Sequence, residues 1–154
     1  MPKNIIKNNL IAIAIHACVC IAVLLPTGIV MGQAGPLWSD SVYSGSTVTQ
    51  WLFIVGTTII AIFLYFFAGR KFLANTGHLL TNALSVIAIP LLMLMVTVIG
   101  FYFPSLFILG LLFTPIVLIS ETISFFLRIE LKYAYMIMSI LPTLAVWLGL
   151  VAKR

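Results

Sequence analysis

Long apolar runs cover most of this chain and restrict the folds that it can adopt. Of its 154 residues, 63% are hydrophobic and only 7% are charged. A soluble domain carries about 25% charged residues, so the polar side chains here are too few to cover a water-facing surface. In lipid, the backbone must satisfy its own hydrogen bonds, as it does in a helix. The sequence therefore predicts an all-α polytopic bundle of transmembrane helices, a single integral membrane domain over residues 1–154.

Five stretches are long enough to cross a membrane, which takes about 20 mostly apolar residues. They are residues 9–31, 50–69, 79–103, 105–127 and 133–152, with a polar outer loop over residues 32–49. Pro90, Pro115 and Pro142 fall within these spans and should kink them. The first run is too long for the core of a signal peptide, and no A-x-A-like site follows it, so we expect it to be retained as a span.

Positive charge predicts the orientation, because Lys and Arg accumulate in cytoplasmic loops. With five spans and a cytoplasmic N-terminus, the cytoplasmic cations are Lys3, Lys7, Arg70, Lys71, Arg128 and Lys132. Lys153 and Arg154 alone fall on the outer side. That exception leaves open a four-span alternative, in which the last segment is re-entrant. We predict a multi-pass protein of a bacterial cytoplasmic membrane.

One of the three acidic residues lies inside an apolar stretch. Glu121 is about seven residues, or about 10 Å, from the cytoplasmic end of the fourth span, where an ionised carboxylate is costly. On a continuous helix, Ser120, Ser124, Arg128 and Lys132 would extend a polar stripe from Glu121 toward the cytoplasm. The stripe indicates either a proton- or cation-linked site in a transporter or a structural carboxylate bonded to a neighbouring helix.

The first span contains the sequence HACVC. His16 and Cys20 are four residues apart on one helical face, so both could approach a soft metal ion. Cys18 points nearly the opposite way, and a metal would need further ligands, such as Met93 or Met95. The alternative is that the cysteines act as small apolar residues and His16 bonds across helices. We favour this alternative and expect no cofactor.

Gly28 and Gly32 form a G-x-x-x-G pattern at the outer end of the first span. Small residues four apart let another helix approach closely, and packing is what drives helix association in lipid. The pair therefore predicts a helix-packing site, although Pro26 just before it can distort the local helix.

Several functional classes are disfavoured by the sequence. It lacks G-x-S-x-G and H-E-x-x-H motifs and a phosphate-binding glycine loop, so we expect no enzyme activity. Its basic residues are scattered between apolar runs and do not form the stripe that nucleic acid requires. We predict a small protein that acts through helix–helix contacts, as an accessory subunit of a membrane complex or an immunity-type protein. Its partners would be the lipid bilayer and a protein, or copies of itself; the alternative is a small oligomeric transporter or channel that uses Glu121.

Overall fold

The computed structural model describes residues 2–34, 48–103, 120, 123–124 and 127–153, and within these it contains helices and no strand. The helices are α1 (Pro2–Ala34), α3 (Val48–Phe72), α4 (Leu79–Leu84), α5 (Ala88–Tyr102), α7 (Leu131–Met138) and α8 (Ile140–Val151). The all-α prediction is confirmed for this part of the chain.

Four segments of the described chain are long and apolar enough to cross a membrane. They are Lys3–Val23, Val55–Phe72, Leu79–Gly100 and Tyr133–Val151, and they correspond to the first, second, third and fifth predicted spans. The predicted fourth span, 105–127, and the outer loop, 32–49, lie mostly outside the described residues. The count of five spans is therefore not confirmed, and the structure supports a multi-pass helical membrane protein.

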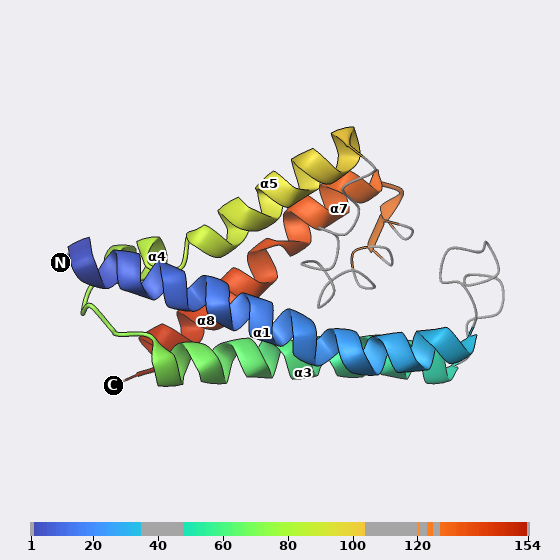
Figure 1. Ribbon diagram of the computed structural model, residues 1–154, viewed down its shortest axis with the longest axis horizontal. Coiled ribbons are helices and arrows are strands. Elements are labelled where there is room, and N and C mark those ends of the chain that lie inside the picture. Colours follow the sequence, from blue (N-terminus) through green and yellow to red (C-terminus); the bar gives the residue numbers. More distant parts are fainter. Residues whose placement is uncertain (1, 35–47, 104–119, 121–122, 125–126, 154) are drawn as a thin grey trace.

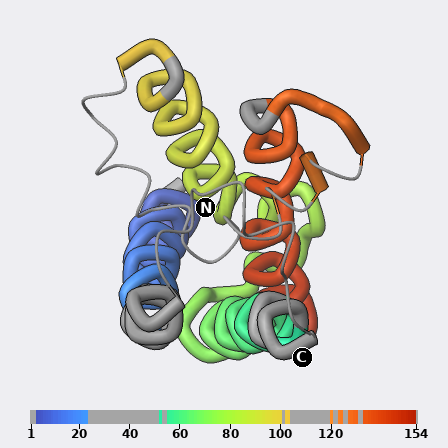
Figure 2. The backbone as a smooth tube through the Cα atoms, turned by 90° about the vertical axis from the view of Figure 1, so that its right-hand side faces the viewer, coloured from blue at the N-terminus to red at the C-terminus, as the bar shows by residue number. Residues whose placement is uncertain are grey.

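The spans form a ring of neighbours, seen along the long axis in Figure 2. Helix α1 packs against α3, α4 and α5, while α8 packs against α3, α5 and α7. Figure 1 shows that α5 and α7 diverge together from the α1–α3 pair toward the end at which α5 finishes. We call this the far end, and the opposite end, where α1 begins, the N-terminal end.

Hydrogen bonds place both chain termini at the N-terminal end (Figure 1). Asn8 Nδ2 donates to the carbonyl of Ala74 at 2.9 Å, and the Ala74 amide donates back to Asn8 Oδ1 at 3.1 Å. Lys153 Nζ donates to the carbonyl of Leu73 at 3.1 Å. The start of α1, the end of α3 and the end of α8 therefore meet, and successive described spans alternate in direction.

This arrangement differs from the five-span topology, which places Lys153 on the side opposite to the N-terminus. It also differs in the position of two cations: Arg128 lies just before α7, and Lys132 lies in its first turn. Because α7 packs against α5 and starts at the far end, these two residues lie at the end opposite to Lys3 and Lys7. The last span crosses the bundle from the far end to the N-terminal end and does not turn back. The structure therefore differs from the re-entrant alternative as well.

Two of the spans are interrupted just before a proline, as Pro90 and Pro142 predict. Pro90 is the third residue of α5, and Pro142 is the third residue of α8. Proline is tolerated in the first turn of a helix, where its missing N–H would have no intrahelical partner, but not further inside. Each span is therefore built from two helices, and a serine lies at each break: Ser85 Oγ donates to the Thr81 carbonyl at 2.8 Å, and Ser139 Oγ to the Met136 carbonyl at 2.7 Å.

Helices α3 and α8 cross at close range, and the crossing depends on two glycines. A Cβ atom added at Gly149 would overlap the carbonyl oxygen of Phe66 and lie 2.9 Å from the amide nitrogen of Arg70. A Cβ atom at Gly69 would overlap the carbonyl oxygen of Val146. The two backbones are thus in direct contact, which is how small residues promote helix packing in lipid.

Candidate functional site

The centre of the bundle holds a polar cluster between α1 and α3. His16 and Tyr65 are 0% and 1% exposed. His16 Nδ1 and the Tyr65 hydroxyl share a hydrogen bond of 2.8 Å, and the two rings stack with their centroids 5.9 Å apart. On the other side of the imidazole, Nε2 lies 3.7 Å from Cys20 Sγ. Buried polar groups in a membrane span need such partners, because lipid supplies none.

The prediction that His16 bonds across helices is confirmed, since Tyr65 belongs to α3. The two thiols face apart as expected: Cys20 is buried and Cys18 is exposed. His16 and Cys20 are close enough to bind one metal ion together. However, the described residues contain no group of three or more His, Cys, Asp and Glu side chains that could hold one.

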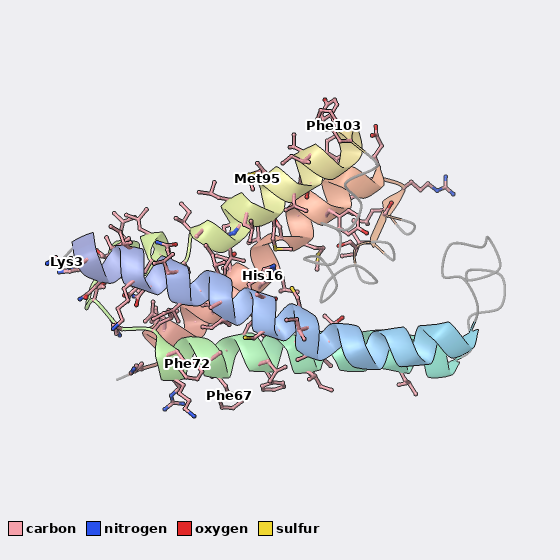
Figure 3. The ribbon with its side chains drawn as sticks, in the orientation of Figure 1. Lys3, His16, Phe67, Phe72, Met95 and Phe103 are labelled. Atoms are coloured by element: carbon pink, nitrogen blue, oxygen red, sulfur yellow. The ribbon has the colours of Figure 1, made fainter. Side chains whose placement is uncertain are left out.

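The two methionines considered as further metal ligands differ in their surroundings. Met93 is fully buried, whereas Met95 is exposed on the outer side of α5, away from His16 (Figure 3). Met95 is therefore not positioned to complete a site at His16. The cluster is best understood as a hydrogen-bonded contact that fixes α1 against α3.

The polar stripe predicted around Glu121 does not continue along one helix. Glu121 itself lies outside the described residues. Arg128 has φ = +53°, in the left-handed region, and the Ile129 amide donates to the Ser124 carbonyl at 3.2 Å. This i→i−5 bond across a left-handed residue is a Schellman motif, which ends a helix. Lys132 belongs to the following helix, so it does not share a face with Ser124.

The remaining members of that stripe have separate roles in the structure. Ser124 Oγ donates to the Ile129 carbonyl at 2.7 Å, so it ties the residue just after the helix end back to the last turn. Ser120 is fully buried, and its hydroxyl has no hydrogen-bond partner among the described residues. Thr143 and Trp147, one turn apart on α8, also carry buried polar atoms without a described partner.

The predicted packing motif of Gly28 and Gly32 lies on α1, which continues as a helix through Pro26 to Ala34. The surroundings of these two glycines are not among the described features, so their role in helix packing stays a prediction. The glycines that do form a close crossing, Gly69 and Gly149, were not identified from the sequence. Ala145 and Gly149, four residues apart, form the small-x-x-x-small signal that could have identified one side of it.

A second polar cluster, at the N-terminal end, also escaped the sequence reasoning. Asn9 Nδ2 donates to the Leu84 carbonyl at 2.8 Å, and the Ala88 amide donates to Asn9 Oδ1 at 2.9 Å. Asn9 therefore supplies hydrogen-bond partners to backbone groups at the break between α4 and α5. Asn82 Oδ1 accepts bonds from the amide and hydroxyl of Thr76, at 2.9 and 2.8 Å, and orders the loop before α4. Asn9 thus joins α1 to the third span, and Asn82 joins the start of that span to the loop before it.

The outward face of α3 carries an aromatic ridge. Phe63 and Phe67 stack with ring centroids 6.2 Å apart, and Phe66 meets Phe67 edge-on at 5.6 Å. Phe63 and Phe67 are each more than half exposed, and Ile59 and Ile60 extend the same apolar face. We call Ile59, Ile60, Phe63 and Phe67 the α3 ridge; Phe67 projects from the outer edge of α3 in Figure 3.

Comparisons with known protein families, with curated proteins and with solved structures found no match. Function is therefore inferred from the chemistry and geometry of the described helices.

Proposed function

We propose that this protein is non-enzymatic and acts through helix–helix contacts inside the membrane, as an accessory subunit of a membrane complex or as an immunity-type protein. The observation that carries the proposal is the α3 ridge. Its rings are held against one another on a rigid helix, and aromatic side chains are over-represented among residues that dominate binding energy at protein interfaces. The ridge is thus a preorganised surface for a partner helix.

The polar groups of the described spans support this proposal because they form hydrogen bonds within the fold. Asn8 and Asn9 bind the backbone of other helices, His16 binds Tyr65, and Thr97 Oγ1 donates to the carbonyl one turn earlier, that of Met93, at 2.8 Å. Each of these groups stabilises the chain's own fold. What the described spans present outward is apolar and suited to contact with another membrane segment.

The proposal includes an orientation with the N-terminal end in the cytoplasm. The cations at that end are Lys3, Lys7, Arg70, Lys71 and Lys153, while Arg128 and Lys132 lie at the far end. The positive-inside rule favours the cytoplasm for the end with more Lys and Arg. With Lys153 at the N-terminal end, this residue no longer breaks the rule, whereas Arg128 and Lys132 do, so the cytoplasmic end holds five of these cations and the far end two.

Co-purification from native membranes in mild detergent tests the proposed function. We expect a stoichiometric protein partner with the wild type and at least tenfold less of it with the double variant Phe63→Ala/Phe67→Ala, since the loss of two aromatic anchors typically costs at least about 2 kcal/mol. Leu148→Ala is the matched control, because Leu148 is similarly exposed but lies on α8. It should retain the partner.

Two results would count against the proposal. One is equal recovery of the partner with the ridge variant and with the control. The other is solute or ion flux in liposomes containing the protein alone, lost in Glu121→Gln without loss of expression, which would establish the transporter alternative.

A further inference from the structure

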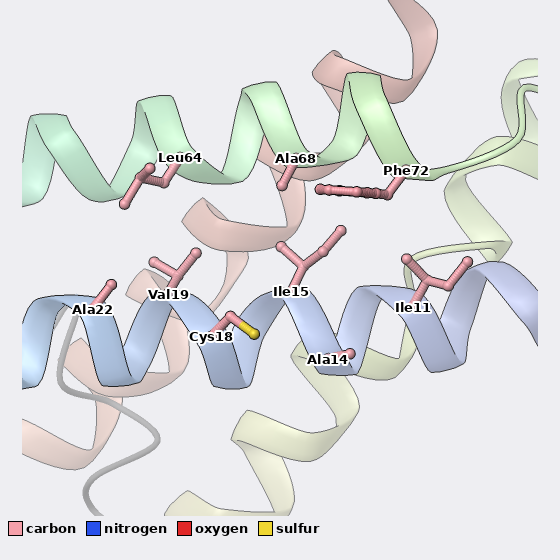
Figure 4. A pocket seen from close by; sticks show the side chains of 9 residues that line it. All are labelled: Ile11, Ala14, Ile15, Cys18, Val19, Ala22, Leu64, Ala68 and Phe72. Atoms are coloured by element: carbon pink, nitrogen blue, oxygen red, sulfur yellow. The ribbon is translucent and has the colours of Figure 1, made fainter.

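A second outward surface, distinct from the α3 ridge, is hollow. Between α1 and α3 runs an open apolar groove of about 420 Å³ (Figure 4). Ile11, Ala14, Cys18 and Ala22 line it along α1, and Leu64, Ala68 and Phe72 line it along α3. It lies within the membrane-spanning parts of both helices, so its natural occupant is a molecule of the bilayer or of another membrane protein.

The groove exists because small side chains lie where large ones would fill the space between the helices. Ala14, Cys18 and Ala22 succeed one another at four-residue intervals on α1, and Ala68 lies opposite on α3 (Figure 4). From Ile11 to Ala22 the groove follows about 16 Å of helix. An apolar cavity of about 150 Å³ holds one benzene molecule, about 25 Å³ per carbon, so this groove has room for about 17 carbon atoms.

Positive charge lies at one end of the groove. Lys71 Nζ is 5.5 Å from the centroid of the Phe72 ring, and that ring lines the groove. Lys7 is exposed and lies one helical turn before Ile11, on the same face of α1 as Cys18. Two cations from two helices therefore flank the mouth of the groove at the N-terminal end of the bundle.

We propose that this groove binds an anionic phospholipid, with one acyl chain in the groove and the headgroup phosphate between Lys7 and Lys71. The charge complementarity and the apolar lining select this class over a zwitterionic lipid, because basic residues near the membrane surface attract anionic headgroups. The inference does not depend on the proposed function, since the groove lining and the α3 ridge share no residue.

Native mass spectrometry of the detergent-solubilised protein tests the proposal, with phosphatidylglycerol and phosphatidylcholine of identical acyl chains as probes. We expect the wild type to bind phosphatidylglycerol more tightly. Lys7→Gln and Lys71→Gln should each weaken that binding roughly fivefold and weaken phosphatidylcholine binding by a smaller factor, because its choline group offsets the phosphate charge. Arg70→Gln is the matched control: it removes the same charge one residue away, about 100° around the helix from Lys71, and should bind like the wild type.

A second arm tests the acyl chain. The double variant Ala14→Leu/Ala22→Leu keeps both lysines but fills the groove, and both substituted positions are exposed, so the fold should tolerate the change. It should lose tight binding of both lipids. Unchanged binding in this variant, equal affinity of the wild type for the two lipids, or an effect of Arg70→Gln equal to that of Lys71→Gln would each overturn the proposal.

Cys18 provides a test for the competing occupant, a second copy of this chain. Its thiol is exposed in the groove, while Cys20 is buried. If the groove is open to lipid, mild oxidation in membranes should leave the protein largely monomeric on non-reducing gels. Efficient disulfide-linked dimers that disappear in Cys18→Ala would show that another copy covers the groove, and would contradict lipid binding there.

Discussion

Replacing Gly149 by alanine should separate α3 from α8 and destabilise the protein by about 2–3 kcal/mol, in the range of overpacking substitutions and at its upper end. The new Cβ atom would overlap the Phe66 carbonyl, which is backbone and cannot rotate away. The helices must move apart, and the buried side chains around the crossing, including Val146 and Leu150, would lose packing contacts. Thermal unfolding of the purified protein in detergent measures the effect.

Gly56→Ala is the matched control for this prediction. Gly56 is also a helical glycine of α3, but a Cβ atom there would meet nothing within 4 Å. Its replacement should change stability by no more than about 1 kcal/mol, in the stabilising direction, because alanine is the better helix former. Equal stability of the Gly149→Ala and Gly56→Ala variants would mean that α8 does not cross α3 closely at Gly149.

The second large effect is expected from His16→Ala. The substitution leaves a cavity between α1 and α3 and removes one hydrogen-bond partner of the buried Tyr65 hydroxyl. Large-to-small changes in a packed core cost about 2–5 kcal/mol, and interhelical hydrogen bonds in membranes contribute about 0.6 kcal/mol on average. We expect a loss of about 3 kcal/mol, measured by the same unfolding assay.

Two further variants separate packing from hydrogen bonding at His16. Tyr65→Phe removes only the hydroxyl and should cost about 1 kcal/mol, while Cys18→Ala, at an exposed position of the same helix, should have almost no effect. In the double variant His16→Ala/Tyr65→Phe the losses should not add, because the two residues share one bond. Strict additivity would show that His16 and Tyr65 act independently.

The sequence predicted the elements well because apolar length alone specifies a transmembrane helix. The breaks before Pro90 and Pro142 were also predictable, since proline removes a backbone donor wherever it occurs. His16 was assigned a cross-helix bond correctly, because a polar side chain in a lipid-embedded span has few other options. Its partner, Tyr65, is 49 residues away, and no spacing rule indicates such a pair.

Features that depend on how helices face one another were not predictable. Arg128 ends a helix with a left-handed conformation that glycine normally adopts, so the polar stripe through it was drawn on a helix that does not continue. The position of Lys153 beside Leu73 depends on the direction of the last span, which charge counting left ambiguous. Gly69 and Gly149 become significant only when the two backbones are seen in contact.

The central claim is that the described helices cross a bilayer in alternating directions and bring both termini to one side. Reporter fusions at each end of the chain in intact cells test it, using a fluorescent protein that folds only in the cytoplasm and a phosphatase that is active only outside. With the arrangement described here, the N-terminal and C-terminal fusions should report the same side of the membrane, which is the cytoplasm in the orientation that we propose. Termini reported on opposite sides of the membrane would contradict it.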